Sequence, residues 1–261
     1  MNAAPFLAQI NWNQPWLIPF RDIAAPIVQS ADWRAALNMA VEHRELRNHR
    51  NLPIRFVPQS ELPPDLAYET FISETGCVPT RDNLHDFFNA LIWLAYPLTK
   101  ARLNELQAAA IAQSSVTSTR GRLRDAITIF DENAAIYIVA DEQFIDVLRK
   151  HEWETLFIQK RATFGKSYAV CLFGHALLEK LVTPYKAITA HAYPLLLAED
   201  ESEIDRASLP VSLDARLANK LSADLNTRYF APLPVLGLPR WHPDQNETYY
   251  QDASVFRPVR K

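Results

Sequence analysis

Glycine and cysteine are both rare in this chain, and their scarcity argues against several classes of site. The five glycines are Gly76, Gly121, Gly165, Gly174 and Gly237. No two of them lie close enough to build a loop that wraps a phosphate, which disfavours dinucleotide-binding and P-loop folds. The two cysteines, Cys77 and Cys171, are far apart in sequence. This spacing disfavours a disulfide framework and a cysteine zinc site, and it fits a reducing compartment.

Long apolar runs and blocks of like charge are also absent. No stretch reaches the roughly 18 apolar residues of a membrane span, and the first residues lack the pattern of a signal peptide. We therefore expect a cytoplasmic protein without a membrane partner. The net charge is −3, and the nearest approach to a basic cluster, Arg120, Arg122 and Arg124, is more typical of a solvated edge than of a phosphate site. No nucleic-acid partner is expected.

The composition does suit a sizeable core. With 261 residues, 48% of them apolar, the chain can form one large domain. We expect a single α+β domain over residues 1–261 that is rich in helix and has a small, mainly antiparallel sheet. The aromatic and proline-rich termini, an arm over residues 1–30 and a tail over residues 232–261, are expected to pack on this core.

Local patterns place the elements of this domain. Apolar periodicity and capping residues predict helices over 32–47, 65–76, 82–96, 97–112, 141–150, 175–182 and 213–225. Residues rich in β-propensity predict strands over 52–58, 126–130, 136–140 and 168–173. The second and third of these strands are expected to form a hairpin, with Asp131, Glu132 and Asn133 in its turn. Surface loops are expected at the Ser/Thr-rich residues 114–119 and at the acidic residues 199–205.

One predicted helix is apolar around most of its circumference and carries a single polar stripe. At 100° per residue, its four polar residues Asp82, His85, Asp86 and Asn89 fall within a wedge of about 100°. Such a helix is largely buried, and the stripe could bind a cation or orient a polar substrate. The alternative is structural: Asp82 caps the helix, Asp86 pairs with Arg81 or a distant arginine, and the other two satisfy buried backbone groups.

A second histidine and carboxylate pair, His175 and Glu179, lies at helical spacing just after Gly174. A strand that passes into a helix can place such side chains at the mouth of a pocket. The full zinc-protease pattern His-Glu-x-x-His is absent, so a divalent metal would need ligands from elsewhere in the chain. Nucleophilic catalysis is not indicated, since no Gly-x-Ser-x-Gly motif occurs and Cys171 lies within an apolar strand.

Four further residues are candidates for binding a substrate. Arg124, before the predicted hairpin, could contact an anion, with Asp125 as a partner carboxylate. Asp131 is a further candidate, although a turn role is the simpler interpretation for it. Lys186 and His191 flank a short apolar segment and could bind an anionic ligand. None of these residues has a spacing that is diagnostic of a reaction.

Three motifs and the tail resemble a bacterial family. The segments are Pro79-Thr-Arg-Asp-Asn-Leu-His-Asp-Phe-Phe-Asn-Ala-Leu-Ile-Trp-Leu-Ala-Tyr-Pro97, Arg122-Leu-Arg-Asp-Ala-Ile-Thr-Ile-Phe-Asp-Glu-Asn133, Leu172-Phe-Gly-His-Ala-Leu-Leu-Glu-Lys180 and Val255-Phe-Arg-Pro. The chain is similar over nearly its whole length to the domain of unknown function numbered 3025. The resemblance implies a bacterial protein built as one family domain, and it supplies no activity, cofactor or catalytic residue.

Two functional hypotheses remain. The first is a small-molecule or metal-dependent enzyme whose candidate catalytic residues are His85, Asp86, Asn89, His175 and Glu179. The second is a non-catalytic binding or protein-interaction domain that uses its aromatic termini. Convergence of the two histidine and carboxylate pairs within about 8 Å around a cavity would favour the enzyme. Substrate, reaction, metal and oligomeric state are not indicated by the sequence.

Overall fold

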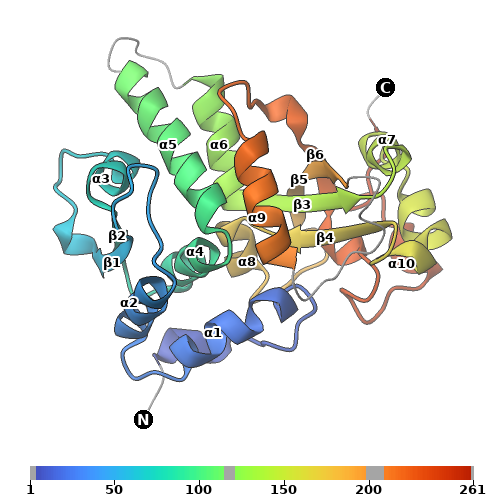
Figure 1. Ribbon diagram of the computed structural model, residues 1–261. Coiled ribbons are helices and arrows are strands. Elements are labelled where there is room, and N and C mark those ends of the chain that lie inside the picture. Colours follow the sequence, from blue (N-terminus) through green and yellow to red (C-terminus); the bar gives the residue numbers. More distant parts are fainter. Residues whose placement is uncertain (1–3, 115–120, 198–208, 260–261) are drawn as a thin grey trace.

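A helix that is buried over all but its first two residues lies at the centre of the fold. In the computed structural model, which describes residues 4–114, 121–197 and 209–259, this helix is α4 (Leu84–Ala95) (Figure 1). Every residue from Asp86 to Ala95 is buried. The helix begins after Asn83, whose side-chain oxygen accepts a hydrogen bond from the Asp86 amide, a typical N-cap. Its burial confirms the prediction made from its apolar circumference.

Helices supply most of the remaining structure. The α-helices besides α4 are α1 (Arg21–Val28), α2 (Trp33–His43), α3 (Tyr68–Thr75), α5 (Pro97–Ser114), α6 (Arg122–Asn133), α7 (Gln143–Arg149), α8 (His175–Lys180), α9 (Leu209–Lys220) and α10 (Glu247–Tyr250). Short 3-10 helices span Pro5–Gln9, Ile18–Phe20, Gln59–Glu61, Arg161–Thr163, Thr227–Tyr229 and Val235–Gly237, and a π-helix spans Thr155–Gln159. No helix within the described ranges combines the length and apolar character needed to cross a bilayer.

The strands form two small sheets. They are β1 (Arg55–Pro58), β2 (Cys77–Thr80), β3 (Ala134–Val139), β4 (Tyr168–Leu172), β5 (Thr189–Leu196) and β6 (Ala231–Pro234). β1 and β2 pair in parallel, while the larger sheet has the order β4-β3-β5-β6 with antiparallel outer pairs and a parallel β3–β5 pair. Figure 1 shows the helices α4, α5, α6 and α8 between the two sheets. The chain is therefore an α+β protein, as expected.

The predicted hairpin is wrong, and this correction matters for the site. Residues 126–130 belong to α6, so of the two strands of the predicted hairpin only the one over residues 136–140 exists, as β3. Leu123, Ala126, Ile127 and Phe130 recur at the helical spacing and face the core. This period outweighs the β-propensity of the two isoleucines and the threonine. Asp131 and Glu132 consequently lie in the last turn of a helix, not in a hairpin turn.

Most other local predictions are confirmed within one turn. The side chain of Asp32 caps α2, and Gly76 ends α3 in the left-handed conformation, with φ of 74°, as glycine does at many helix C-termini. The last predicted helix is displaced: it was expected over residues 213–225, and α9 runs from Leu209 to Lys220. The expected loops at 114–119 and 199–205 fall almost entirely outside the described residues.

Both terminal segments pack on the core. Trp12 of the arm contacts Phe87 of α4, with ring centroids 6.4 Å apart. Trp16 is buried against Trp241 of the tail, with centroids 5.6 Å apart, and Phe256 near the end of the chain is buried as well. The aromatic residues that suggested an interaction surface thus contact the protein's own interior.

A close backbone contact fixes where α8 begins. A Cβ atom on Gly174 would lie 2.5 Å from the Cα and N atoms of Asn133 and 2.6 Å from the N atom of Ala134. The Gly174 amide also donates to the carbonyl of Ala134. Only glycine permits this approach, and it brings the first residue of α8 beside the last turn of α6.

We expect Gly174→Ala to destabilise the protein by about 1–3 kcal/mol, because the new methyl group meets backbone atoms that cannot rotate away. Urea unfolding followed by circular dichroism measures this change. Gly121→Ala is the matched control: a Cβ there has no neighbour within 4 Å, so this variant should lose only the preference of the α6 N-cap for glycine over alanine, about 0.5–1 kcal/mol. Equal effects of the two substitutions would contradict the packing argument.

Candidate metal centre

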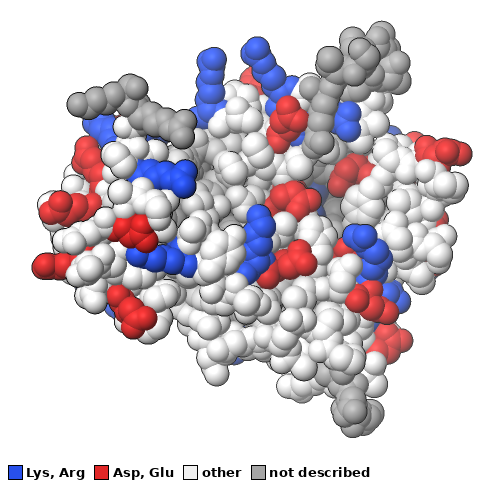
Figure 2. Space-filling model, turned by 180° about the vertical axis from the view of Figure 1, so that it is seen from behind, with Lys and Arg blue, Asp and Glu red and all other residues white. Residues whose placement is uncertain are grey.

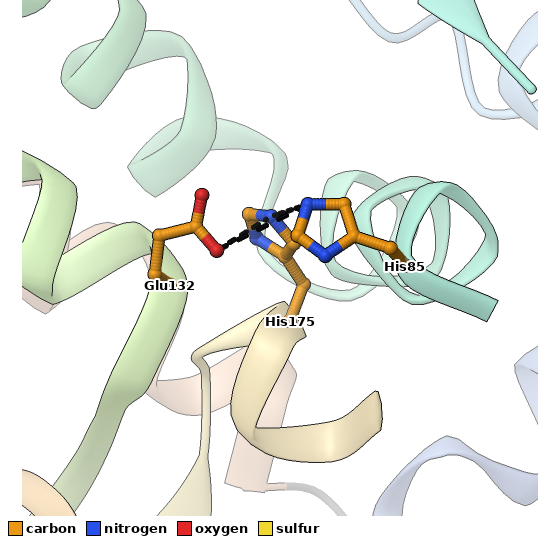
Figure 3. Close-up of side chains that lie close together, drawn as sticks. All are labelled: His85, Glu132 and His175. Carbon is orange, nitrogen blue, oxygen red and sulfur yellow. Dashed lines mark hydrogen bonds and ion pairs between the residues drawn. The ribbon is translucent and has the colours of Figure 1, made fainter. Parts of the chain in front are cut away.

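Side chains from three helices converge at one point. His85 projects from α4, Glu132 from α6 and His175 from α8, and their polar atoms face one another (Figure 3). The Nε2 atoms of the two histidines are 3.1 Å apart. The carboxylate oxygen Oε2 of Glu132 lies 3.4 Å from Nε2 of His175 and 4.0 Å from Nε2 of His85.

These separations match the ligand shell of a metal ion. Two ligand atoms bound tetrahedrally at about 2.0–2.1 Å from zinc lie about 3.3 Å apart, close to the 3.1 and 3.4 Å observed, while the 4.0 Å between Glu132 and His85 is longer. Two histidines and one carboxylate are also a ligand set of catalytic zinc and non-haem iron sites. Nitrogen atoms as close as those of His85 and His175 share either a proton or a cation. The adjacent Glu132 carboxylate favours the cation.

A neighbouring carboxylate holds the ring of His85 in place, whereas Nδ1 of His175 is buried without a hydrogen-bond partner among the described residues. Nδ1 of His85 lies 3.0 Å from Oε2 of Glu179. A carboxylate only accepts, so in the neutral ring Nδ1 carries the proton and Nε2 keeps its lone pair. Nδ1 of His175 faces Oδ2 of Asp131 at 3.9 Å. Carboxylates behind ligating histidines orient the ring and increase its basicity in metal sites.

His175 is the most deeply buried member of the cluster, with 4% of its surface exposed. Burial lowers the pKa of His175 to about 4; Asp131 opposes this shift, while Lys100 and His85 add to it. The imidazole is therefore neutral at physiological pH. A neutral ring offers the lone pair that a metal ligand needs.

Negative charge is concentrated around the histidines. Burial, reinforced by repulsion from Asp131, raises the pKa of Glu132. Burial also acts to raise the pKa of Asp131, but attraction to Lys100 and His175 lowers it overall, and Nζ of Lys100 lies 2.6 Å from its Oδ1. Apart from Lys100, no cation within the described residues lies this close to these carboxylates. A divalent cation between the histidines would relieve the repulsion.

The cluster opens into a hollow of about 290 Å³. Its wall is lined by Gln59, Leu62, Tyr68, Glu69, Pro79, Arg81, His85, Asp86, Asn89, Asp131, Glu132 and His175. Figure 2 shows that basic and acidic side chains are interspersed on one face of the molecule, and that its middle is hollowed with acidic side chains around it. The hollow has room for a small polar molecule beside the histidines.

Of the four residues of the polar stripe, only His85 belongs to this cluster, and the other three contact residues around it. Asp82 lies before the helix and accepts hydrogen bonds from Trp33 and Arg34, so its predicted capping role is wrong and Asn83 is the cap. Asp86 forms a two-pronged ion pair with Arg81, at 3.0 Å on each prong, as the structural interpretation predicted. Asn89 joins the Lys100 network instead of a backbone group.

The expected convergence is present in part: His85 meets His175 and Glu179, whereas Asp86 pairs with Arg81. The catalytic roles of these residues stay predictions. The substrate-binding candidates are scattered. Asp131 lines the hollow, but Arg124 does not. Lys186 pairs with Asp252 at 2.9 Å, and His191 on β5 lies 2.8 Å from Nδ2 of Asn133; neither lines the hollow.

Sequence reasoning missed Glu132 and Lys100 as members of the site. Glu132 was assigned to a hairpin turn, and the helical spacing of residues 123–130 is the signal that places it in α6. Lys100, Asn104 and Gln107 recur at spacings of four and three residues on α5. This polar stripe resembles that of α4 and could have marked a second inward-facing edge.

Fold and site together define an α+β protein with a histidine and carboxylate cluster in a hollow between helices. The family described as "Protein of unknown function (DUF3025)" matches residues 54–260. The chain belongs to this family, and the match includes all three residues of the cluster. No curated protein and no solved structure gives a significant match.

The lowered pKa of His175 makes stability depend on pH. Its folded pKa of about 4 lies below the ordinary 6.5, so the unfolded chain binds more protons between these values. The stabilisation is complete above pH 6.5 and is lost as the pH falls toward 4. Between pH 7 and pH 5 the loss is about 2 kcal/mol.

Urea unfolding at pH 7 and pH 5 measures this loss, with wild type compared with His175→Gln. The variant should lose less stability on acidification than the wild type. His43→Gln, at an exposed histidine outside the site, should behave like the wild type. If His175→Gln retained the full pH dependence, the lowered pKa would be assigned to the wrong residue.

Proposed function

We propose that this protein is a divalent-metal-dependent enzyme that acts on a small polar molecule. The observation that carries the proposal is the convergence of Nε2 of His85, Nε2 of His175 and the carboxylate of Glu132 at distances suited to one ion. Three protein ligands are the number found in catalytic zinc sites, where the remaining position is left for water or substrate.

The environment of the cluster supports a catalytic role over a purely structural one. His85 and Glu132 keep 33% and 39% of their side-chain surfaces exposed, and the hollow beside them admits a ligand. Structural metal sites are closed by four protein ligands. The open side of this cluster therefore leaves a coordination position that faces the hollow.

Hydrolysis is the reaction for which the site offers the most parts. A divalent ion at this position would lower the pKa of a bound water and so provide a nucleophile near neutral pH. Glu179 holds the ring of His85 and Asp131 faces that of His175. Asp131, which lines the hollow and is not one of the three ligands, would be the carboxylate that accepts a proton from the bound water.

The second hypothesis, a non-catalytic interaction domain, has lost its main support. It was based on aromatic residues in the termini, and Trp16, Trp241 and Phe256 are buried against the core. A small-molecule partner is accordingly our proposal. Cytoplasmic location and bacterial origin stay predictions.

Metal binding is the first test. The chelator-treated full chain is titrated with Zn²⁺, and anaerobically with Fe²⁺, by isothermal titration calorimetry. We expect one equivalent to bind. His175→Ala and Glu132→Gln should weaken binding by at least ~100-fold, because loss of a ligand costs more affinity than the 10–100-fold lost when a group that only orients a ligand is removed. His43→Ala should bind like the wild type. Binding that survives both site substitutions would refute the assignment.

Glu179→Gln tests the orienting role of the carboxylate behind His85. The substitution keeps the size of the side chain and removes its charge, so metal affinity should fall by about 10–100-fold while the fold is retained. Glu154→Gln, at an exposed glutamate on the surface, is the matched control. Unchanged affinity in Glu179→Gln would show that Glu179 does not act on the metal through His85.

Activity is tested with the metal-loaded protein on a panel of ester, amide and phosphate substrates. Turnover should require the metal and should disappear in His175→Ala. Absence of turnover by every metal-loaded form, with metal binding intact, would favour a binding role for the centre.

A further inference from the structure

A smaller hollow adjoins the candidate metal centre. Its volume is about 90 Å³, which is enough for a few water molecules or a compact chemical group. Glu69, Asp131 and Glu132 line both hollows, so the two share a wall. We call the smaller one the inner chamber; its other polar lining residues are Trp93, Lys100, Asn104, Gln107 and Thr128.

Three buried polar atoms on residues of this wall have no hydrogen-bond partner within the described part of the chain. They are Nε1 of Trp93, Oδ1 of Asn104 and Oε1 of Gln107. Trp93 and Asn104 are 1% and 2% exposed, so bulk solvent does not reach them. Most buried polar groups are satisfied by protein or by ordered water. Three such atoms around one cavity indicate an occupant.

The orientation of the Asn104 amide is set by its neighbours. Its Nδ2 atom donates to the carbonyl oxygen of Glu69 at 2.8 Å and to Oε2 of the same residue at 2.6 Å. The Oδ1 atom is therefore the one left without a partner. The chamber thus offers one unpaired N–H donor, from Trp93, and two unpaired carbonyl acceptors.

We infer that the inner chamber binds a neutral carboxamide or ureido group. Such a group has one carbonyl oxygen, which accepts from the indole N–H of Trp93, and an NH₂ whose two hydrogens match the carbonyl oxygens of Asn104 and Gln107. A carboxylate has no hydrogen to donate and would face Glu69 and Asp131. An ammonium group has no acceptor for Trp93 and would lie beside Lys100.

The shared wall connects this group to the candidate metal centre. Asp131 directs Oδ1 toward Lys100, a lining residue of the inner chamber, and Oδ2 toward His175 of the metal centre. A molecule whose amide end occupies the inner chamber would therefore lie one shared wall away from the metal ligands. Identification of the amide-bearing molecule as a substrate rests on the proposed function, whereas its binding in the chamber does not.

Three probes of nearly equal size test the chemistry of the chamber: propanamide, propanoate and propylamine. Their binding to the full chain, with and without Zn²⁺, is measured by saturation-transfer NMR. Propanamide should bind at least about fivefold more tightly than the other two, as one additional neutral hydrogen bond provides. Stronger binding of propanoate or propylamine would overturn the assignment of a neutral amide.

Substitutions in the wall locate the bound probe. Gln107→Met removes the carbonyl acceptor and keeps the chain length, so propanamide should bind about fivefold more weakly. Gln113→Met changes an exposed glutamine on the same helix and should have no effect. No detectable propanamide binding, or binding indifferent to Gln107→Met, would mean that the chamber holds only water.

His175→Ala separates this inference from the proposed function, because His175 lines the outer hollow and is not among the lining residues of the inner chamber. If the variant loses Zn²⁺ and keeps propanamide, both assignments stand as separate sites. If wild type binds propanamide and never binds metal, the proposed function fails while the amide site is supported. If wild type binds metal and never binds propanamide, the amide site fails while the proposed function is supported.

Discussion

The close contact between Gly174 and the Asn133–Ala134 backbone is the constraint on which the site depends. It joins the point where β4 passes into α8 to the point where α6 passes into β3. The end of α6 and the start of α8 meet there, and each carries a residue of the metal centre in its terminal turn. His175 is the first residue of α8, and Glu132 is the penultimate residue of α6. Any side chain at Gly174 would push these ends apart.

Buried charge is the second organising feature. Lys100 lies 5% exposed between Asp131, Asn89 and the ring of Trp93, so it ties α5 to α4 and α6. A buried ion pair contributes little net stability, because desolvation offsets its attraction. Here Lys100 compensates one carboxylate and leaves Glu132 and Glu179 free to face His85 and His175. The surplus of negative charge on that side is what a divalent cation would neutralise.

The periodicity of α4 made half of the site predictable. Its stripe named His85, Asp86 and Asn89 as inward-facing polar residues, and the spacing of His175 and Glu179 named the second pair. Residues 126–130 misled because isoleucine and threonine favour strands, while their positions repeat with a helical period. Propensity is a weak local preference, and burial of Ala126, Ile127 and Phe130 decided between the two. The error displaced Glu132, the carboxylate that completes the cluster.

The sequence by itself determined the α+β class, the buried helix α4 and the family, because composition, apolar period and capping residues act over short distances along the chain. It also disfavoured phosphate loops and cysteine sites through the residues it lacks. Only the tertiary structure decided which polar residues meet. His85 and His175 are ninety positions apart and touch through helix packing, Lys186 and His191 lie elsewhere, and the wall of the inner chamber combines residues from α3, α4, α5 and α6. Such contacts depend on how helices pack in space, and no local pattern encodes that.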